Sequence, residues 1–473
     1  MNLARHSISS TNPIHILDTH FDPDCKIFTA STPEGFAVYR TWPLKLLRKH
    51  ELTGGTLAAA FPLHTTNLLF LLGGGRSPLY PPNKVIVWDD ALGKEVAELE
   101  FRERVRGLTC RRGWLAVALR RRVVVFQVGE RLKRHAEWDT CDNPRGLLAI
   151  ATAPFSTLLA IAGRQTGHVQ LIHLPPCPPP VTNGPPSSSP PRRPPPPPTK
   201  HPVSIIVAHT TALTTLTLPP SGRLLATTSS RGTLVRIWDS YTGKLVRELR
   251  RGTDKAEIYG VAFRPDEQEL CVWSDKGTVH IFTLVVSGAS YVRLWGDIYA
   301  ILIISRNRQS TFSPLTPFLP LPKYFESEWS YAQYRIPVQS SHISLSSASR
   351  SSTVDLPDEE RCVVGWIDVS NEDKTTPTRA PEHQLIALTY TGGWYRLSLP
   401  PAKKSSSFTG ASTLAGSSPP RPVPLVRQRT SSASSTISRL DKGKEKERDK
   451  KEKHTTNCVL EEYRKFGRWD GWG

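Results

Sequence analysis

The sequence lacks several features that would assign the protein to a membrane-spanning or secreted class. No apolar run approaches the ~20 residues that an α-helix needs to cross a bilayer. The most apolar stretch, Tyr291–Ser305, is shorter and contains Arg293 and Asp297. The first residues, MNLARHSISSTNP, contain no apolar segment of the kind found in secretory signals. We therefore expect neither an integral membrane protein nor a secreted one.

Cysteine is scarce, and the motifs of common enzymes are missing. The seven Cys residues are scattered without a CxxC pair, which excludes a zinc ribbon or a disulfide scaffold and fits reduced thiols. There is no glycine-rich phosphate loop, no HExxH, no GxSxG and no paired-carboxylate signature. We therefore expect no enzyme, no metal and no cofactor.

Apolar residues are also fewer than usual, and two segments of low complexity account for part of the deficit. The apolar share of the 473 residues is 38%, against about 45–50% in typical domains. Residues 174–202 hold 15 of the 42 prolines and predict a disordered insertion, for which a ligand role toward a polyproline-reading domain is the alternative. Residues 401–457 predict a basic, disordered Ser/Lys-rich tail. Residues 458–473 regain aromatic side chains and should dock on the fold.

What the sequence does contain is a recurring strand that ends in an apolar–aromatic pair. Short β-rich runs alternate with Gly, Pro, Asn and Asp turns, and helical periodicity is almost absent. The strand recurs at Tyr39, Trp88, Phe126, Ile172, Trp238, Phe282 and Tyr395, with spacings of 49, 38, 46, 66, 44 and 113 residues. The spacing of 66 contains the proline insertion, and the spacing of 113 implies another insertion after Phe282. The corrected period matches the ~40–45 residues of a WD40-type blade.

Seven such strands predict seven blades. We expect residues 12–400 to form an all-β, seven-bladed WD40-type β-propeller with long disordered insertions and a tail. In the strands VIVWDD and VRIWDS, the aromatic residue of the Trp-Asp pair should pack between blades. A propeller by itself favours a binding protein.

The charge and one constellation of residues indicate what is bound. The net charge of +19 favours an anionic partner. Two similar segments, SSRGTLVRIW (229–238) and SDKGTVHIF (274–282), each supply hydroxyls, a Gly turn and a basic side chain, and LRRG (249–252) lies between them. Consecutive side chains on a strand point to opposite faces, so Arg250 and Arg251 would serve two separate pockets. Arginine with hydroxyls and histidine is typical of a phosphate site. A surface charge pair with ordinary turn residues is the alternative.

At these residues the chain resembles the PROPPINs, or WIPI proteins, which are seven-bladed propellers that bind phosphoinositides. The family motif [FL]-R-R-G is similar to Leu249, Arg250, Arg251 and Gly252, and Leu at its first position resembles the WIPI three/four branch. The resemblance covers roughly residues 65–340. It extends to NKVIVWDD (83–90), TCDNPRGL (140–147), GHVQLI (167–172), SDKGTVHIF (274–282) and LPKYFESEWSYAQYRIP (321–337).

The resemblance implies binding of phosphatidylinositol 3-phosphate and phosphatidylinositol 3,5-bisphosphate at two sites on one rim. The first site would comprise Arg250, His209, Ser229, Thr233 and Arg236. The second would comprise Arg251, Ser274, Thr278 and His280. A histidine protonated beside a phosphate would strengthen binding mildly at lower pH.

The family also has a membrane-inserting loop in blade six, which corresponds to residues 283–321. Its apolar candidates are Trp295, Ile301, Ile303, Phe312 and Phe318, and burial contributes about 1.5–3 kcal/mol for each large apolar side chain. Residues Ser290–Arg306 are less polar than such loops in the family, so a translated intron is the alternative. In that case the anchor would consist of Phe312 and Phe318.

The resemblance further implies a peripheral protein of the cytoplasm that acts on autophagosomal precursor, endosomal and vacuolar or lysosomal membranes. Its implied partners are the bridge-like lipid-transfer proteins of autophagy, and the chain is expected to be a monomer. A WD-type scaffold that binds only proteins is the main alternative. A nucleic-acid partner is not expected, because the basic tail has almost no aromatic residues for base stacking before Tyr463.

Overall fold

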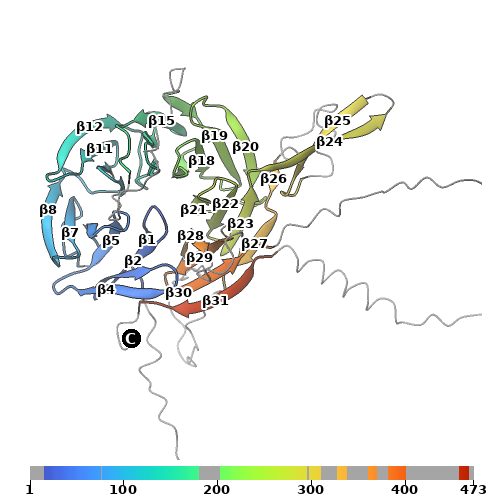
Figure 1. The fold of residues 1–473 in the computed structure, drawn as a ribbon. Coiled ribbons are helices and arrows are strands. Elements are labelled where there is room, and N and C mark those ends of the chain that lie inside the picture. Colours follow the sequence, from blue (N-terminus) through green and yellow to red (C-terminus); the bar gives the residue numbers. More distant parts are fainter. Residues whose placement is uncertain are drawn as a thin grey trace, which may run out of the picture.

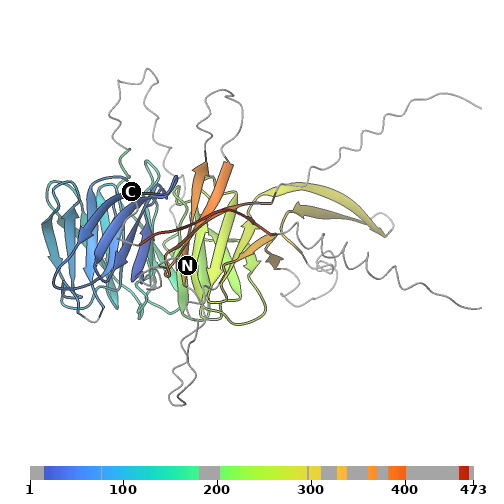
Figure 2. The same cartoon turned by 90° about the horizontal axis from the view of Figure 1, so that it is seen from below.

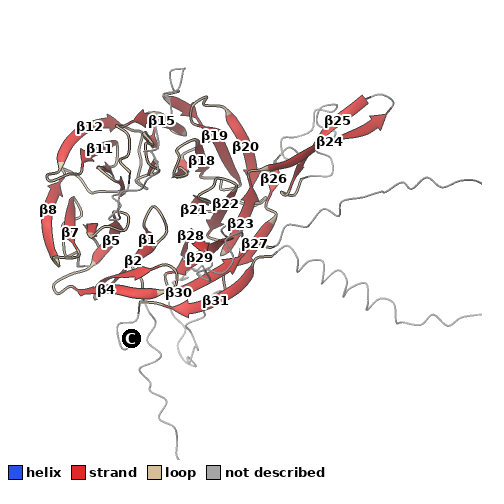
Figure 3. Cartoon of the chain, in the orientation of Figure 1, coloured by secondary structure: helices blue, strands red, loops and turns tan. Residues whose placement is uncertain are grey.

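The computed structural model describes residues 15–75, 77–179, 203–295, 298–309, 327–337, 361–369, 382–400 and 457–467. Every regular element in these ranges is a β-strand (Figure 3). The strands form eight sheets, seven of which stand around one axis as the blades of a propeller (Figure 1). The predicted all-β, seven-bladed propeller is therefore confirmed. Most of the proline insertion (180–202) and nearly all of the tail (401–456) lie outside the described residues.

Each of the first four blades is an antiparallel sheet whose strands follow one another in the chain. Blade 1 contains β1 Asp18–Phe21, β2 Ile27–Thr32, β3 Gly35–Arg40 and β4 Lys45–Glu51. Blade 2 contains β5 Leu57–Pro62, β6 Leu68–Gly73, β7 Lys84–Asp89 and β8 Lys94–Glu100. Blade 3 contains β9 Gly107–Arg111, β10 Trp114–Ala118, β11 Arg122–Gln127 and β12 Lys133–Asp139. Blade 4 contains β13 Leu148–Ile150, β14 Leu158–Ala162, β15 His168–His173 and β16 Ile205–Val207.

The last three blades carry the long insertions. Blade 5 contains β17 Leu213–Thr217, β18 Leu224–Ser229, β19 Leu234–Asp239 and β20 Leu245–Arg250, and gains β26 Glu328–Trp329 at its outer edge. Blade 6 contains β21 Ile258–Phe263, β22 Glu269–Ser274, β23 Thr278–Thr283 and β27 Ala332–Arg335. Blade 7 contains β28 Cys362–Val369, β29 Glu382–Thr389, β30 Gly393–Ser398 and β31 Val459–Lys465.

A two-stranded hairpin leaves the ring between the third and fourth strands of blade 6. Its strands, β24 Val286–Trp295 and β25 Ile298–Ser305, pair antiparallel with each other in a sheet of their own. Figures 1 and 2 both show this hairpin, which we call the arm, projecting outward from the rim.

The recurring sequence strand is the third strand of every blade. The seven apolar–aromatic landmarks lie on β3, β7, β11, β15, β19, β23 and β30. In the two Trp-Asp strands, Trp88 and Trp238 are buried between blades. Asp89 accepts hydrogen bonds from the backbone amides of the turn that follows it, those of Ala91 at 2.9 Å and Leu92 at 3.1 Å. The motif therefore combines packing between blades with a turn cap.

Strand alternation explains how the blades pack. Val85 and Val87 of β7 are buried against blade 3, whereas Ile86 and Trp88 of the same strand are buried against blade 1. In the described part of the chain there are seven buried clusters, one at each boundary between neighbouring blades. Because both faces of inner strands such as β6 and β7 are covered, these strands read as nearly continuous apolar runs.

The ring closes by packing between blades 1 and 7, without strand exchange among the described residues. The closing cluster joins Phe28 and Tyr39 of blade 1 to Trp394 of blade 7. Phe466, just beyond β31, packs edge-on against Phe28, with ring centroids 5.2 Å apart. The end of the described chain thereby becomes part of the closure.

Candidate anion-binding rim

The LRRG motif lies at the end of β20, where strand alternation separates its two arginines. Leu249 is fully buried in the cluster between blades 5 and 6. In the pairing of β20 with β19, Glu248 faces Arg236 and Arg250 faces Leu234. Arg250, Glu248 and Arg236 therefore lie on one face of the sheet, and Leu249 lies on the other. Arg251 comes next and returns to the blade 6 side.

On the Arg250 side, polar side chains form a connected chain. The Nε of Arg236 is 3.0 Å from one carboxylate oxygen of Glu248. The other oxygen accepts a hydrogen bond from the Ser327 hydroxyl at 3.2 Å. Arg250 in turn donates to the Ser327 oxygen at 3.5 Å. The two arginines are therefore held near each other through one acidic and one hydroxyl side chain.

His209 and the two hydroxyl residues of the first predicted site lie around this chain in different ways. Arg236 also donates to the carbonyl of Ala208 at 2.8 Å, which brings it next to His209. His209 is buried, with its Nε2 at 2.9 Å from the Thr227 hydroxyl. Ser229 and Thr233 contribute through their carbonyls, which accept the amides of Gly232 at 2.8 Å and Arg251 at 3.0 Å.

On the other side, Arg251 is held by the backbone. It is only 7% exposed. Its Nε donates to the carbonyl of Gly232 at 2.9 Å, and Nη2 donates to that of Asp254 at 2.5 Å. Its charge interacts with that of Asp275 and disfavours protonation of His280, both of which belong to blade 6. The guanidinium is thus fixed in orientation before any ligand arrives.

The remaining residues of the second predicted site belong to the turn after β22 and to β23. The buried Ser274 hydroxyl accepts the Lys276 amide at 3.4 Å, and Thr278 donates to the Lys276 carbonyl at 3.4 Å. The Nδ1 of His280 lies 3.1 Å from the Ser330 hydroxyl. The structure therefore connects Arg236 with Arg250 on one side and places Arg251 near His280 on the other. The hydroxyl residues Ser229, Thr233, Ser274 and Thr278 lie at or next to the ends of the neighbouring strands β18, β19, β22 and β23.

Burial and neighbouring cations keep both histidines neutral. Burial, and then the charge of Arg236, lowers the pKa of His209 to about 4. Burial, and then the charge of Arg251, lowers the pKa of His280 to about 4. Burial also lowers the pKa of the Arg251 guanidinium. A bound phosphate would raise these two pKa values and so oppose the effect of the arginines, because a nearby anion favours the charged imidazole.

Sequence reasoning missed three residues of this rim. Glu248 connects Arg236 with Ser327, and the alternating pattern LVRELR was the available signal for it. Ser327 and Trp329 come from the segment after the arm. Trp329 pairs in register with Arg250, whose guanidinium carbon lies 6.0 Å from the indole centroid. Their segment belongs to the family motif at residues 321–337, but the strand that it adds to blade 5 depends on tertiary structure.

The apolar residues predicted to enter a membrane are only partly described. Trp295 ends β24, and Ile301 and Ile303 lie on β25. Phe312 and Phe318 lie outside the described residues. The described residues include no helix capable of spanning a bilayer.

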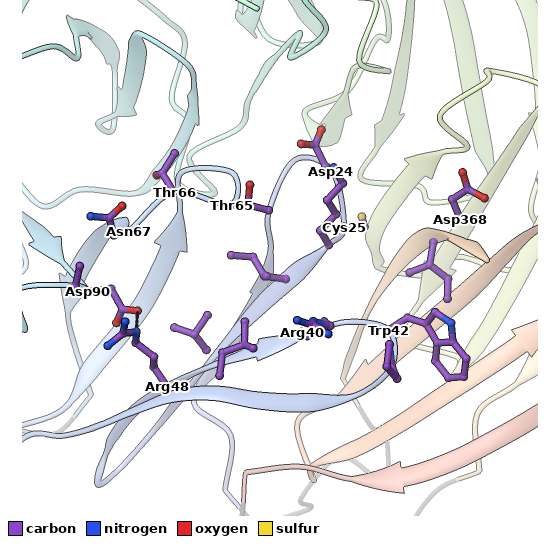
Figure 4. A pocket seen from close by; sticks show the side chains of 17 residues that line it. Asp24, Cys25, Arg40, Trp42, Arg48, Thr65, Thr66, Asn67, Asp90 and Asp368 are labelled. Carbon is purple, nitrogen blue, oxygen red and sulfur yellow. Dashed lines mark ion pairs between the residues drawn. The ribbon is translucent and has the colours of Figure 1, made fainter. Parts of the chain in front are cut away.

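A large pocket with different chemistry lies beside blade 1 (Figure 4). It has a volume of about 1010 Å³ and is lined by strands and loops of blades 1, 2 and 7. Its charged residues balance, because Lys26, Arg40 and Arg48 are offset by Asp24, Asp90 and Asp368. This balance gives no preference for a phosphate, and the pocket contains none of the predicted site residues.

One group in the described part of the chain has the composition of a metal site. Ligand atoms of Asp22, Asp24 and His64 lie within 4.8 Å of one another. Burial raises the pKa of Asp22 to about 6, and its carboxylate accepts the amides of Ile27 at 2.9 Å and Asp24 at 3.3 Å. These bonds give Asp22 a structural role in the turn between β1 and β2.

Fold and rim together define a seven-bladed β-propeller with a cationic double-arginine edge. The PROPPIN family model matches residues 199–293, which include this edge. SVP1-like protein 2 of Pichia angusta is 30% identical over 323 residues, covering 68% of this chain and 81% of that protein. Autophagy-related protein 18e of Arabidopsis thaliana is 30% identical over 334 residues, covering 70% and 78%. The chain belongs to the PROPPIN family, the phosphoinositide-binding propellers of autophagy.

Solved structures show the same fold. Kluyveromyces lactis Hsv2 with a complete loop 6CD has a TM-score of 0.56 at 18% identity, covering 96% of this chain and 99% of that one. A complex of KlAtg21 with the coiled coil of AgAtg16 gives 0.55 at 14% identity, with coverage of 96% and 100%.

Proposed function

We propose that the protein binds phosphatidylinositol 3-phosphate and phosphatidylinositol 3,5-bisphosphate at two sites on the rim of blades 4 to 6. The observation that carries this proposal is the separation of Arg250 and Arg251. One arginine joins Arg236 through Glu248 and Ser327, and the other lies near His280 with its guanidinium fixed by two carbonyls. Guanidinium groups bind phosphate oxygens through paired, charge-assisted hydrogen bonds.

Two weak headgroup sites act together on one vesicle. Once the first headgroup is bound, the second site meets its ligand at a high effective concentration, so avidity exceeds either single affinity. The arm would add a third contact by placing Trp295, Ile301 and Ile303 in the bilayer interface. This proposal makes the protein a peripheral membrane effector that recruits autophagy machinery.

The deciding experiment is vesicle flotation with a double variant. We expect wild-type protein to float with vesicles that contain phosphatidylinositol 3-phosphate, but not with vesicles of unphosphorylated phosphatidylinositol. The variant Arg250→Thr/Arg251→Thr should lose at least about tenfold in affinity, because both sites lose their charge-assisted bonds. A matched control is Arg120→Thr/Arg121→Thr, which removes two consecutive exposed arginines from blade 3.

Other outcomes would reject the proposal. Equal flotation of wild type and the double variant would assign the binding to the arm or the basic tail. No flotation of either protein would leave a scaffold that binds only proteins. Equal losses in the double variant and the control would indicate an effect of net charge alone.

Partners and compartments extend the same proposal. The chain would recruit bridge-like lipid-transfer proteins of autophagy to autophagosomal precursor, endosomal and vacuolar or lysosomal membranes. The family relationship supports this role, and Leu249 before the two arginines is the feature that resembles the WIPI three/four branch. With both histidine pKa values near 4 in the free protein, tighter binding at pH 6 would require bound phosphate to raise them by about 2 units.

A further inference from the structure

The segment Ser327–Tyr331, which we call the brace, connects the Arg250 group to the base of the arm. At one end it adds β26 alongside β20, with Leu249 facing Glu328 and Arg250 facing Trp329. At the other end the Tyr331 amide donates to the carbonyl of Ile281 in blade 6 at 3.0 Å. The brace therefore crosses from the edge of blade 5 to blade 6 at the place where the arm leaves the ring.

The chain that returns from the arm is hydrogen-bonded to the brace. Arg308 and Trp329 exchange two backbone hydrogen bonds, at 3.1 and 2.8 Å. Trp329 is the same residue that lies beside Arg250. Only one residue, Trp329, separates the arginine of the first proposed headgroup site from the backbone that carries the arm.

Asn307 clips the two chains at the base of the arm together. It is 4% exposed. Its Oδ1 accepts the amide of Thr283 at 2.8 Å, and its Nδ2 donates to the carbonyl of the same residue at 2.8 Å. Nδ2 also donates to Glu328 of the brace at 2.5 Å, and Glu328 is ion-paired with Arg247 of β20. One side chain thus ties both ends of the arm to the brace and to blade 5.

Arg306 makes a second set of contacts at the base of the arm. Its guanidinium carbon lies 4.3 Å from the centroid of the Tyr331 ring, and its Nη1 lies 3.7 Å from Glu269. Tyr331 donates to that same carboxylate at 2.6 Å. Arg306 also donates to the carbonyl of Pro400 in the chain that leaves blade 7. The base of the arm is therefore anchored to blades 5, 6 and 7.

We infer that the brace, with Asn307 as its clip, holds the arm at a fixed position relative to the Arg250 headgroup site. A bound headgroup would then place the arm at the bilayer surface without a further search, which lowers the ordering cost of the second contact. Asn307 and Glu328 act as positioning residues, because they would touch neither headgroup nor lipid tail. This inference rests on the proposed function.

The test separates headgroup affinity from membrane affinity. The variants are Asn307→Ala and Glu328→Gln, and the probes are short-chain, water-soluble phosphatidylinositol 3-phosphate and vesicles containing the full lipid. We expect affinity for the soluble probe to change less than about twofold and vesicle affinity to fall about tenfold. Hydrogen exchange at the Arg308 and Trp329 amides should become faster in both variants.

Asn143→Ala is the matched control. Asn143 is 3% exposed and makes the same two-point clip, accepting the Leu147 amide at 2.9 Å and donating to its carbonyl at 3.2 Å. It follows β12 of blade 3, a strand that Figure 1 shows on the side of the ring away from the arm. Its loss should lower stability to a similar extent and leave vesicle affinity unchanged.

The possible results distinguish the two claims. Equal losses for the soluble probe and the vesicles, or unchanged exchange at Arg308 and Trp329, would overturn the brace. A loss of vesicle affinity in Asn143→Ala as large as that in Asn307→Ala would also overturn it. If the wild-type protein binds neither probe, both the proposed function and the role of the brace on membranes are wrong. Unchanged hydrogen exchange in the variants would by itself refute the claim that the brace fixes the base of the arm.

Discussion

At the scale of single residues, burial decides how the charged groups of the rim behave. Arg251 is almost inaccessible and donates to two backbone carbonyls, whereas Arg250 lies in a network of side chains. The two arginines are the same residue type, yet their described contacts differ, because Arg251 donates to main-chain carbonyls and Arg250 donates to the Ser327 side chain. Substitution of Arg251 should therefore also disturb the loop that follows β20, so the thermal midpoint of the double variant should be measured alongside its flotation.

The two neutral histidines predict a loss of stability in acid. Their pKa values of about 4 in the fold lie below the value of about 6.5 in an unfolded chain. The unfolded state therefore binds more protons below pH 6.5, so the free energy of unfolding falls as the pH drops from 6.5 toward 4. Between pH 7 and pH 5 each histidine should lower the free energy of unfolding by about 2 kcal/mol.

Urea unfolding at both pH values checks this prediction. His209→Gln and His280→Gln should each show a smaller difference between pH 7 and pH 5 than wild type. The exposed His135 of β12 supplies the control, since His135→Gln should leave the difference unchanged. Equal pH dependence in all four proteins would contradict the assignment of buried, neutral rings.

At the scale of elements, β31 pairs with a strand that lies far from it in the chain. It completes blade 7 by pairing with β30 across more than 50 intervening residues, and Ser398 faces Val459 in the register. Because these ends are adjacent, the long connection is not needed to bring them together. The entropic cost of closing the loop also depends only weakly on its length, since each doubling of the loop length adds only about 0.6 kcal/mol.

Two deletions test the role of this strand. Replacement of residues 401–456 by a short Gly-Ser linker should leave the thermal midpoint within a few degrees of wild type. Truncation after Pro400 should lower it far more, because it exposes the edge of β30 and removes Phe466 from the closing cluster. Similar midpoints for both deletions, measured by calorimetry, would show that β31 is dispensable.

At the scale of the whole molecule, the boundary between blades 1 and 7 holds the ring shut. The described contacts across it are mainly apolar packing, supplemented by a backbone bond from Ile16 to Tyr390 at 3.0 Å and a bond from Tyr390 to Asp18 at 2.7 Å. Trp394 is fully buried there and stacks on Trp42, with centroids 6.1 Å apart. Its packing is therefore a large share of what opposes opening.

Trp394→Ala should cost about 3–5 kcal/mol, as expected for a large aromatic side chain lost from a packed core. The measurement is the free energy of unfolding in urea, together with amide exchange in β1 and β30. Exchange should accelerate first in these two strands, because Trp394 packs at the boundary between their blades. Trp366→Ala, at the boundary of blades 6 and 7, is the comparison variant and should not accelerate amide exchange preferentially in β1. A loss below about 1 kcal/mol would contradict the role of Trp394.

The sequence by itself determined the number of blades and indicated Arg250 and Arg251 as the pair of candidate binding residues. The third strand of each blade must present apolar residues to both neighbours and then turn, and this local requirement leaves a repeat that can be counted. Alternation along β20 likewise separated Arg250 from Arg251, because it follows from backbone geometry alone.

Tertiary structure decided everything that depends on segments distant in the chain. Glu248, Ser327 and Trp329 join the rim only because β26 returns beside β20 after the arm. Neutral histidines result from burial and from arginines on adjacent strands, which composition does not report. The clip at Asn307 depends on Thr283, 24 residues away, and the closure depends on Phe466 meeting Phe28. Such contacts are set by how the blades pack around the ring, and no local pattern encodes them.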